Sequence, residues 1–239
     1  MENGRRPVIQ VRDLHKVYSI GKNKIHALNG VSLDIFEGEF CAIVGTSGSG
    51  KSTMLNMLAG LEKPTKGQVV INGHHMESMS ENQLVSFRRD HVGFIFQSFN
   101  LLQTMTAVEN VALPLVFRGV DKKMRIEAAE KVLELVGLAD HKKHKPNEMS
   151  GGQQQRVGVA RALVVDPDII FADEPTGNLD SNTSKEIMRM MKKVVREQKK
   201  TLVMVTHDLE QAEIADRVFH IIDGKIVKIE EHGREDELE

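Results

Sequence analysis

The sequence contains a single cysteine, no long apolar run and no excess of charge of either sign. One cysteine excludes a disulfide framework, which fits a reducing compartment. That residue, Cys41, lies in the apolar stretch "FCAIVG", so we expect a small buried hydrophobic residue rather than a reactive thiol. A net charge of −2 offers no broad basic face, so nucleic acid is not expected as a partner.

Signals for membrane insertion and secretion are missing as well. No segment approaches the ~20 apolar residues that a membrane-spanning helix needs, and the opening residues "MENGRRPVIQ" lack the apolar centre of a secretory signal. We therefore expect a cytoplasmic protein that reaches a membrane only through a partner. The composition, 40% hydrophobic and 28% charged over 239 residues, is typical of a globular protein with a sizeable core.

The order of apolar runs predicts the fold class. Short runs rich in β-branched residues alternate with longer amphipathic segments, which predicts an α/β protein with a mostly parallel central sheet. The segments 8–19 and 25–39 have the pattern of antiparallel strands. Apolar residues at three- and four-residue spacing predict an inserted helical subdomain over 98–163. We therefore expect one domain, 1–239, whose core is formed by 1–97 and 164–239.

The segment "GTSGSGKS", residues 45–52, follows the pattern G-x-x-x-x-G-K-[ST] between a buried strand and a helix. Its glycines allow backbone N–H groups to turn toward phosphate oxygens. Lys51 is expected to reach the β- and γ-phosphates, and the Ser52 hydroxyl to bind Mg²⁺. The alternative is a glycine-rich turn that only starts a helix. The residues expected to contact the triphosphate are Gly45, Thr46, Ser47, Gly48, Ser49, Gly50, Lys51, Ser52 and Thr53.

A pair of carboxylates follows a later strand. In "DIIFADE", residues 168–174, four apolar residues deliver Asp173 and Glu174 to the carboxyl end of that strand, where ligands of open α/β sheets bind. Because side chains alternate along a strand, we expect the two carboxylates on opposite sides. Asp173 then fits a role beside Mg²⁺, and Glu174 fits the residue that polarises the attacking water. The alternative is a strand end that merely meets solvent.

The segment "MSGGQQQR", residues 149–156, is a second glycine turn at the start of a helix, where unpartnered backbone N–H groups favour an anion. It cannot wrap the triphosphate held by residues 45–52 of the same chain without very close approach. The simpler hypothesis is a symmetric head-to-tail dimer, in which this loop of each subunit closes over the nucleotide of the other. The alternative is that Ser150 is an ordinary N-cap residue.

These segments, with Gln97 after "GFIF", "GNLD", and His207 in "VMVTHD", resemble the motif set of ABC-type ATPases. In chain order they are similar to the Walker A, Q-loop, signature, Walker B, D-loop and H-loop, and the resemblance extends from about Val8 to Ile229. It implies a P-loop NTPase of the ABC ATPase type, with an antiparallel β layer and a helical subdomain that carries the signature. Met149 stands where the family usually has leucine, which keeps an apolar contact.

The resemblance also implies a role for each matched position. Tyr18 matches the aromatic residue that stacks on adenine of ATP, with a half-buried strand tyrosine as the alternative. The residues implied at the Mg²⁺ ion are Ser52, Gln97 and, next to the ion, Asp173. The implied catalytic residues are Glu174, His207 and Lys51. The residues implied to face the ATP of the other subunit are Ser150, Gly151, Gly152 and Gln153, with Asp180 at the dimer interface.

A narrower resemblance concerns "SGSGKSTMLNMLAGLEKPTKGQVVINGH", "RRDHVGFIFQSFNLLQTMTAVENVALPL" and "ADEPTGNLDS". These segments are similar to the macrolide-export and lipoprotein-release branch, the MacB and LolD type, with the cell-division FtsE type nearby. The resemblance implies an ATP-hydrolysing transporter subunit that forms a homodimer upon ATP binding. It also implies an FtsX- or MacB-like membrane permease with a large extracytoplasmic domain, and export or extraction of peptide, drug or lipoprotein. The chain would then be peripheral on the cytoplasmic face of the membrane.

Other functions and motifs remain as alternatives. A soluble ABC-type ATPase acting on DNA or ribosomes usually carries long coiled coils or a second ATPase domain, and the sequence shows neither. A small-molecule kinase would leave "MSGGQ", "GNLD" and His207 without a role. The apolar residues of "FQSFNLL" fit either subdomain core or the edge of a groove for a permease helix. The histidine pairs in "GHH" and "HKKH" are interpreted as solvated rather than as metal ligands.

Overall fold

The computed structural model describes residues 7–232. The chain forms two compact units: the first combines the described residues up to Ser86 and from Thr201 onward, and the second is Phe87–Lys200. Helix α2 (Glu81–His91) contains the first boundary between them. In the described part of the chain, no helix is both long and apolar enough to cross a membrane.

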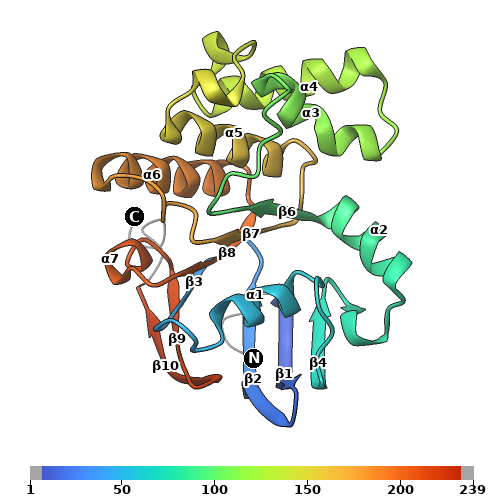
Figure 1. The fold of residues 1–239 in the computed structure, drawn as a ribbon, viewed down its shortest axis with the longest axis vertical. Coiled ribbons are helices and arrows are strands. Elements are labelled where there is room, and N and C mark those ends of the chain that lie inside the picture. Colours follow the sequence, from blue (N-terminus) through green and yellow to red (C-terminus); the bar gives the residue numbers. More distant parts are fainter. Residues whose placement is uncertain (1–6, 233–239) are drawn as a thin grey trace. The chain divides into compact units, whose positions relative to one another are not determined.

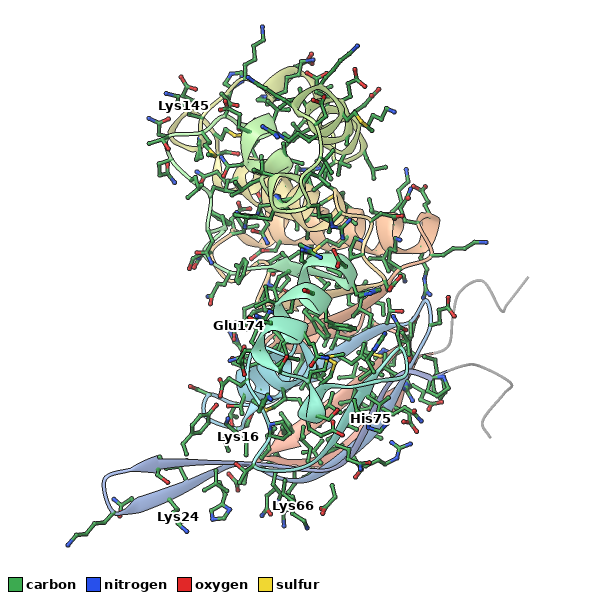
Figure 2. The ribbon with its side chains drawn as sticks, turned by 90° about the vertical axis from the view of Figure 1, so that its right-hand side faces the viewer. Lys16, Lys24, Lys66, His75, Lys145 and Glu174 are labelled. Carbon is green, nitrogen blue, oxygen red and sulfur yellow. The ribbon has the colours of Figure 1, made fainter. Side chains whose placement is uncertain are left out.

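An antiparallel sheet forms one layer of the first unit (Figure 1). The long strands β1 (Pro7–Ile20) and β2 (Asn23–Phe36) pair antiparallel along their length, which confirms the prediction for this region. Strands β4 (Lys66–Ile71) and β5 (His74–His75) continue the sheet in the order β2-β1-β4-β5. Figure 2 shows the β1–β2 hairpin with Lys24 near its far end. This layer carries Tyr18 on β1.

The second sheet of this unit contains β3 (Phe40–Val44), β8 (Thr201–Thr206), β9 (Arg217–Ile222) and β10 (Lys225–Glu231). Strand β3 pairs in parallel with both β8 and β9, whereas β10 pairs antiparallel with β9. Every residue of β3 is buried. Cys41 is fully buried, as expected, and burial raises the pKa of its thiol well above its usual range.

A buried ion pair fixes the start of β3, the strand that leads into the phosphate loop. Arg217 Nε lies 2.5 Å from Glu39 Oε1, and Glu39 also accepts the N–H of Phe36 at 2.8 Å. Although burial alone would lower it, the Glu39 carboxylate holds the pKa of Arg217 above its ordinary value. Next to this pair, Asp216 accepts the N–H of Phe40 at 2.8 Å. These contacts join the start of β3 to the start of β9.

The second unit contains two parallel strands, β6 (Val92–Ile95) and β7 (Ile169–Asp173), together with helices on which the remaining motifs lie. The parallel pairing here and around β3 confirms the predicted α/β class. The helices are α3 (Ala107–Phe117), α4 (Lys122–Leu135), α5 (Gly151–Leu163) and α6 (Ser181–Glu197), with short 3₁₀ turns at Ala139–His141 and Pro146–Glu148. Figure 1 shows α3, α4 and α5 gathered together in green and yellow. The extent of the helical subdomain, 98–163, stays a prediction.

Short elements complete the first unit. Helix α1 (Lys51–Leu58) follows the phosphate loop, and the short helix α7 (Leu209–Ala212) follows β8. A 3₁₀ turn, Met76–Ser78, follows β5. The β9–β10 hairpin turns through Asp223 and Gly224, both with positive φ, as the "DG" pair predicts.

Candidate nucleotide-binding site

The phosphate loop, residues 45–52, leaves β3 and enters α1. No side chain caps the start of α1, and its first turn carries no acidic residue. Two of the loop's three glycines are required by close packing: a Cβ on Gly45 would lie 2.3 Å from the carbonyl oxygen of Ile221, and one on Gly50 would lie 2.3 Å from that of Ala27. The helix start therefore presents uncapped N–H groups at a loop whose backbone is fixed by its neighbours, an arrangement that favours an anion.

Lys51 lies inside this loop. Its ammonium donates to the carbonyl oxygens of Gly45 at 2.8 Å and Thr46 at 3.0 Å, and only 6% of the residue is exposed. Within the described residues, no carboxylate forms an ion pair with it. The hydroxyl of Ser49 is also buried, without a hydrogen-bond partner in the described structure. A buried cation and an unsatisfied hydroxyl beside uncapped N–H groups fit a phosphate group.

The other expected contacts of this loop lie at its surface. Thr46, Ser47 and Gly48 are exposed, as is Ser52 in the first turn of α1, whereas Thr53 is half-buried. An exposed serine hydroxyl at this position can be reached by an ion that arrives together with a nucleotide. The contacts of the individual loop residues with phosphate stay predictions.

Tyr18 is a half-buried residue of β1 whose hydroxyl has a partner. The hydroxyl donates to Glu62 Oε2 at 2.7 Å, and the ammonium of Lys16 lies 5.1 Å from the ring centroid. Burial and the Glu62 carboxylate raise the pKa of Tyr18. The ring is therefore held in place by its polar end, which suits a fixed aromatic surface. Its predicted contact with adenine stays a prediction.

The second of the two carboxylates, Glu174, does not continue strand β7. The strand ends at Asp173, and Glu174 adopts the left-handed backbone region with φ of 43°. Alternation requires both residues to continue the strand, so this ground for placing the two carboxylates on opposite sides does not hold, and the sides to which they point stay a prediction. A non-glycine residue with positive φ is uncommon and costs about 1–3 kcal/mol. The turn is closed by the N–H of Gly177, which donates to the Glu174 carbonyl at 3.0 Å.

Gln97, just beyond β6, is brought next to this turn. Its carbonyl accepts a hydrogen bond from the Asn178 side chain at 3.0 Å. A Cβ on Gly177 would lie only 2.7 Å from Gln97 Nε2, so only glycine allows the amide this close. The positioning role of Gly177 and Asn178 was not predicted from the sequence, although both residues lie in the "GNLD" segment. The glycine followed by an asparagine in this segment was the sequence feature that could have indicated this role.

The signature turn, residues 150–153, begins α5 with a reciprocal pair of hydrogen bonds. The Ser150 hydroxyl accepts the N–H of Gln153 at 3.3 Å, and the Gln153 side-chain oxygen accepts the N–H of Ser150 at 2.9 Å. Ser150 is therefore the N-cap residue, as the alternative interpretation expected. Its hydroxyl keeps its own hydrogen for a further acceptor. A Cβ on Gly152 would lie 2.6 Å from the Thr183 side chain, so this position has no room for a larger residue.

Two further predicted residues lie at helix starts or strand ends. Asp180 is the N-cap of α6, and its carboxylate accepts from the Thr183 hydroxyl at 2.6 Å and from two backbone N–H groups. These donors, with the Thr183 hydroxyl first, lower the pKa of Asp180. His207 is exposed immediately after β8, and the following Asp208 caps α7. The structure thus assigns Asp180 a capping role that the motif did not indicate.

Gln155 is the one residue of the triple glutamine that is fully buried, and it offers a stability test. Neither polar atom of its amide has a partner in the described structure. Because a buried unsatisfied amide costs about 1–3 kcal/mol, Gln155→Met is expected to raise the free energy of unfolding by about that amount, as measured by urea denaturation. The control is Gln154→Met, since the Gln154 amide donates to the Met149 carbonyl. An unchanged or lower stability of Gln155→Met would show that the amide is satisfied in solution.

Comparison with known sequences finds a matching family model and similar proteins that span most of this chain. A family model described as "ABC transporter" matches residues 28–177, well over half of the chain. An uncharacterized ABC transporter ATP-binding protein of Thermotoga maritima is 49% identical over 228 residues, covering 95% of this chain and 97% of that protein. The macrolide export ATP-binding/permease protein MacB of Chlorobaculum tepidum is 48% identical over 92% of this chain, which spans only 34% of that protein.

A solved structure shows the same fold. It is described as a dimeric, post-hydrolysis state of the ATP-binding cassette MJ0796 bound to ADP and Pi, a protein of Methanocaldococcus jannaschii. It is 43% identical to this chain and superposes with a TM-score of 0.86, covering 95% of this chain and 99% of the other. The arrangement of strands and helices described above is therefore that of a known nucleotide-binding cassette.

Proposed function

We propose, on the premise that this chain belongs to the ABC transporter family and is an ATP-binding cassette ATPase, that it is the motor subunit of a transporter. It would work as a head-to-tail homodimer around two MgATP and drive a membrane permease. The observation that carries the proposal is the buried ammonium of Lys51, held by carbonyl oxygens at the uncapped start of α1. A triphosphate supplies the anion that this arrangement lacks.

The first unit is proposed to bind ATP. Lys51 exchanges its carbonyl partners for the β- and γ-phosphates, and the backbone N–H groups of residues 45–52 surround the phosphate oxygens. Tyr18, anchored through its hydroxyl to Glu62, offers its ring to the adenine. Ser52, exposed on the first turn of α1, is proposed to hold Mg²⁺. His207, after β8, is proposed to act near the γ-phosphate.

The second unit is proposed to supply the hydrolytic residues. Glu174 orients and deprotonates the attacking water, since its carboxylate is held on a turn whose backbone is fixed by Gly177. Gln97 and Asp173 are the proposed Mg²⁺ contacts from this unit, with Asp173 next to the ion rather than bound to it. A bound Mg²⁺ would supply charge stabilisation for the transferred phosphoryl group.

The signature turn is proposed to act on the nucleotide of the partner subunit. The related cassette MJ0796 is described as dimeric with ADP and Pi, and the same arrangement in this chain would use Ser150, Gly151, Gly152 and Gln153. The Ser150 hydroxyl can donate to a phosphate oxygen while it still accepts the capping N–H of Gln153. Asp180, which caps α6, is proposed to lie at the same interface. ATP binding would close the dimer and hydrolysis would release it.

The permease is proposed to be of the FtsX or MacB type, with a large extracytoplasmic domain. The MacB relative is described as an ATP-binding/permease protein, and this chain spans 34% of it. We infer that this cassette works with a membrane part of the same kind, and that the transported molecule is a peptide, drug or lipoprotein. The proposed contact is the helical subdomain, 98–163, where Leu102 is 44% exposed beside the buried Leu101. This chain would then sit on the cytoplasmic face of the membrane.

The motor proposal can be tested by purifying the tagged chain from its native membranes. Mass spectrometry then identifies the proteins that accompany it. We expect a membrane protein with four spans and a large outer domain to accompany the chain. The matched control is a chain with Leu102→Glu, which should fold equally but recover less of that protein, because a carboxylate opposes an apolar contact. A six-span permease would contradict the MacB-type branch, and the absence of any membrane protein would contradict the motor role.

A further inference from the structure

The Gln153 side chain connects the signature turn to the "HKKH" segment. Its oxygen accepts the backbone N–H of Ser150 at 2.9 Å. A backbone N–H can only donate, so this bond fixes which end of the amide faces Ser150. The other end, the NH₂ group, therefore points to His141, whose Nε2 lies 3.0 Å away. The amide is a donor toward the imidazole, and His141 must accept.

An acceptor role requires the neutral form of the imidazole. A protonated histidine carries N–H on both ring nitrogens and has no acceptor left. Two donors would then face each other across 3.0 Å. Rotation of the Gln153 amide does not solve this, since it would turn the NH₂ group against the N–H of Ser150. The chain of bonds from Ser150 through Gln153 to His141 therefore has one allowed polarity, which protonation of His141 breaks.

The charged groups around His141 come from its own segment and from the elements packed against it, among which α3 has Glu109 in its first turn, engaged by the Thr106 N–H at 2.8 Å. Within the described residues, no Asp or Glu forms an ion pair with His141. On its own segment, Asp140 precedes it, Lys142 and Lys143 follow it, and the His144 ring lies 5.1 Å away between centroids. From the packed helix α4, Glu130 is engaged by Lys142 at 2.9 Å. In the 3₁₀ turn Pro146–Glu148, the Glu148 carboxylate accepts the backbone N–H of Lys145. Figure 2 labels Lys145.

We propose that His141 is a positioning residue for the signature turn and makes the turn dependent on pH. The neutral imidazole holds the Gln153 amide and thereby the hydrogen bond that this amide accepts from the Ser150 N–H, whereas the protonated imidazole releases both. This inference rests on the proposed contact of residues 150–153 with the nucleotide of the partner subunit. ATP-driven dimerisation and ATP turnover then fall roughly three- to tenfold between pH 8 and pH 5.5 through this residue, about the effect of one lost capping interaction.

ATP turnover and MgATP-driven dimerisation between pH 8 and pH 5.5 test the functional part. His141→Gln replaces the acceptor nitrogen by an amide oxygen that does not titrate, so it should match wild type at pH 8 and lose the three- to tenfold decrease. His141→Phe offers no acceptor and should be low at every pH. His144→Gln is the matched control and should follow wild type. All four proteins retain His207, so the difference between profiles reports His141 alone.

Nuclear magnetic resonance of the wild-type protein without nucleotide tests the hydrogen-bond chain directly. The side-chain NH₂ signals of Gln153 and the backbone N–H signal of Ser150 should shift together with the titration of the His141 ring. Signals that do not follow that titration would overturn the inference, whatever becomes of the proposed function. Signals that do follow it, combined with identical pH profiles for wild type and His141→Gln, would overturn the link to turnover and count against the proposed role of the signature turn.

Discussion

Glu174→Gln is expected to lower ATP turnover by roughly 10²–10⁴-fold, the usual effect of losing a general base. The amide has the size and shape of the carboxylate, so it keeps the left-handed turn at residue 174 and its bond from Gly177. It cannot take a proton from water, however. The phosphate loop, formed by residues 45–52, is unchanged, so ATP binding should persist. Steady-state hydrolysis and size-exclusion chromatography with bound-nucleotide analysis should show an inactive, ATP-bound dimer.

The matched control is Glu197→Gln, which makes the same chemical change at an exposed position of α6. Glu197 lies 3.8 Å from Lys193 in a surface pair, which contributes little to stability. This variant should hydrolyse ATP like wild type. Near-wild-type hydrolysis by Glu174→Gln would remove Glu174 from the role of general base. Loss of ATP binding in the same variant would instead show that the substitution disturbs the site as a whole.

The sequence predicts best those features whose residues are contiguous. The phosphate loop is defined by spacing within eight residues, and its neighbours β3 and α1 follow from one apolar run and one helical pattern. The antiparallel strands β1 and β2 are equally local, because each has its own alternation. The Ser150 cap also follows from a short pattern, in which a glutamine stands three residues after a serine.

The sequence does not predict features that depend on where a strand or helix ends, or on contacts between residues far apart in the chain. Strand alternation does not extend to Glu174, because β7 ends at Asp173 and a strand end is set by the pairing partner. The close approach of Gln97 to Gly177 joins residues that are far apart in the chain. The contact of Gln153 with His141 spans 12 positions and depends on how the turns after α4 fold. Periodicity carries no information on such contacts.

Ser150→Arg is expected to abolish ATP hydrolysis while leaving ATP binding by the isolated subunit almost intact. The substitution removes the hydroxyl that caps α5 and places a long cation where we propose that the partner's nucleotide binds. Binding within one subunit should survive, because the proposed contacts of the bound ATP belong to the phosphate loop and Tyr18. Equilibrium binding of ATP by the monomer and steady-state hydrolysis at high protein concentration measure the two effects separately.

Thr106→Arg is the matched control for the lost cap. Thr106 and Glu109 form the same reciprocal pair at the start of α3 as Ser150 and Gln153 form at the start of α5. Both arginine variants should therefore lose a similar stability of about 0.5–2 kcal/mol, but only Ser150→Arg should lose hydrolysis. If Thr106→Arg were equally inactive, helix capping alone would explain the loss. If ATP binding by the Ser150→Arg monomer fell as far as its hydrolysis, the signature turn would act within its own subunit and not across the dimer.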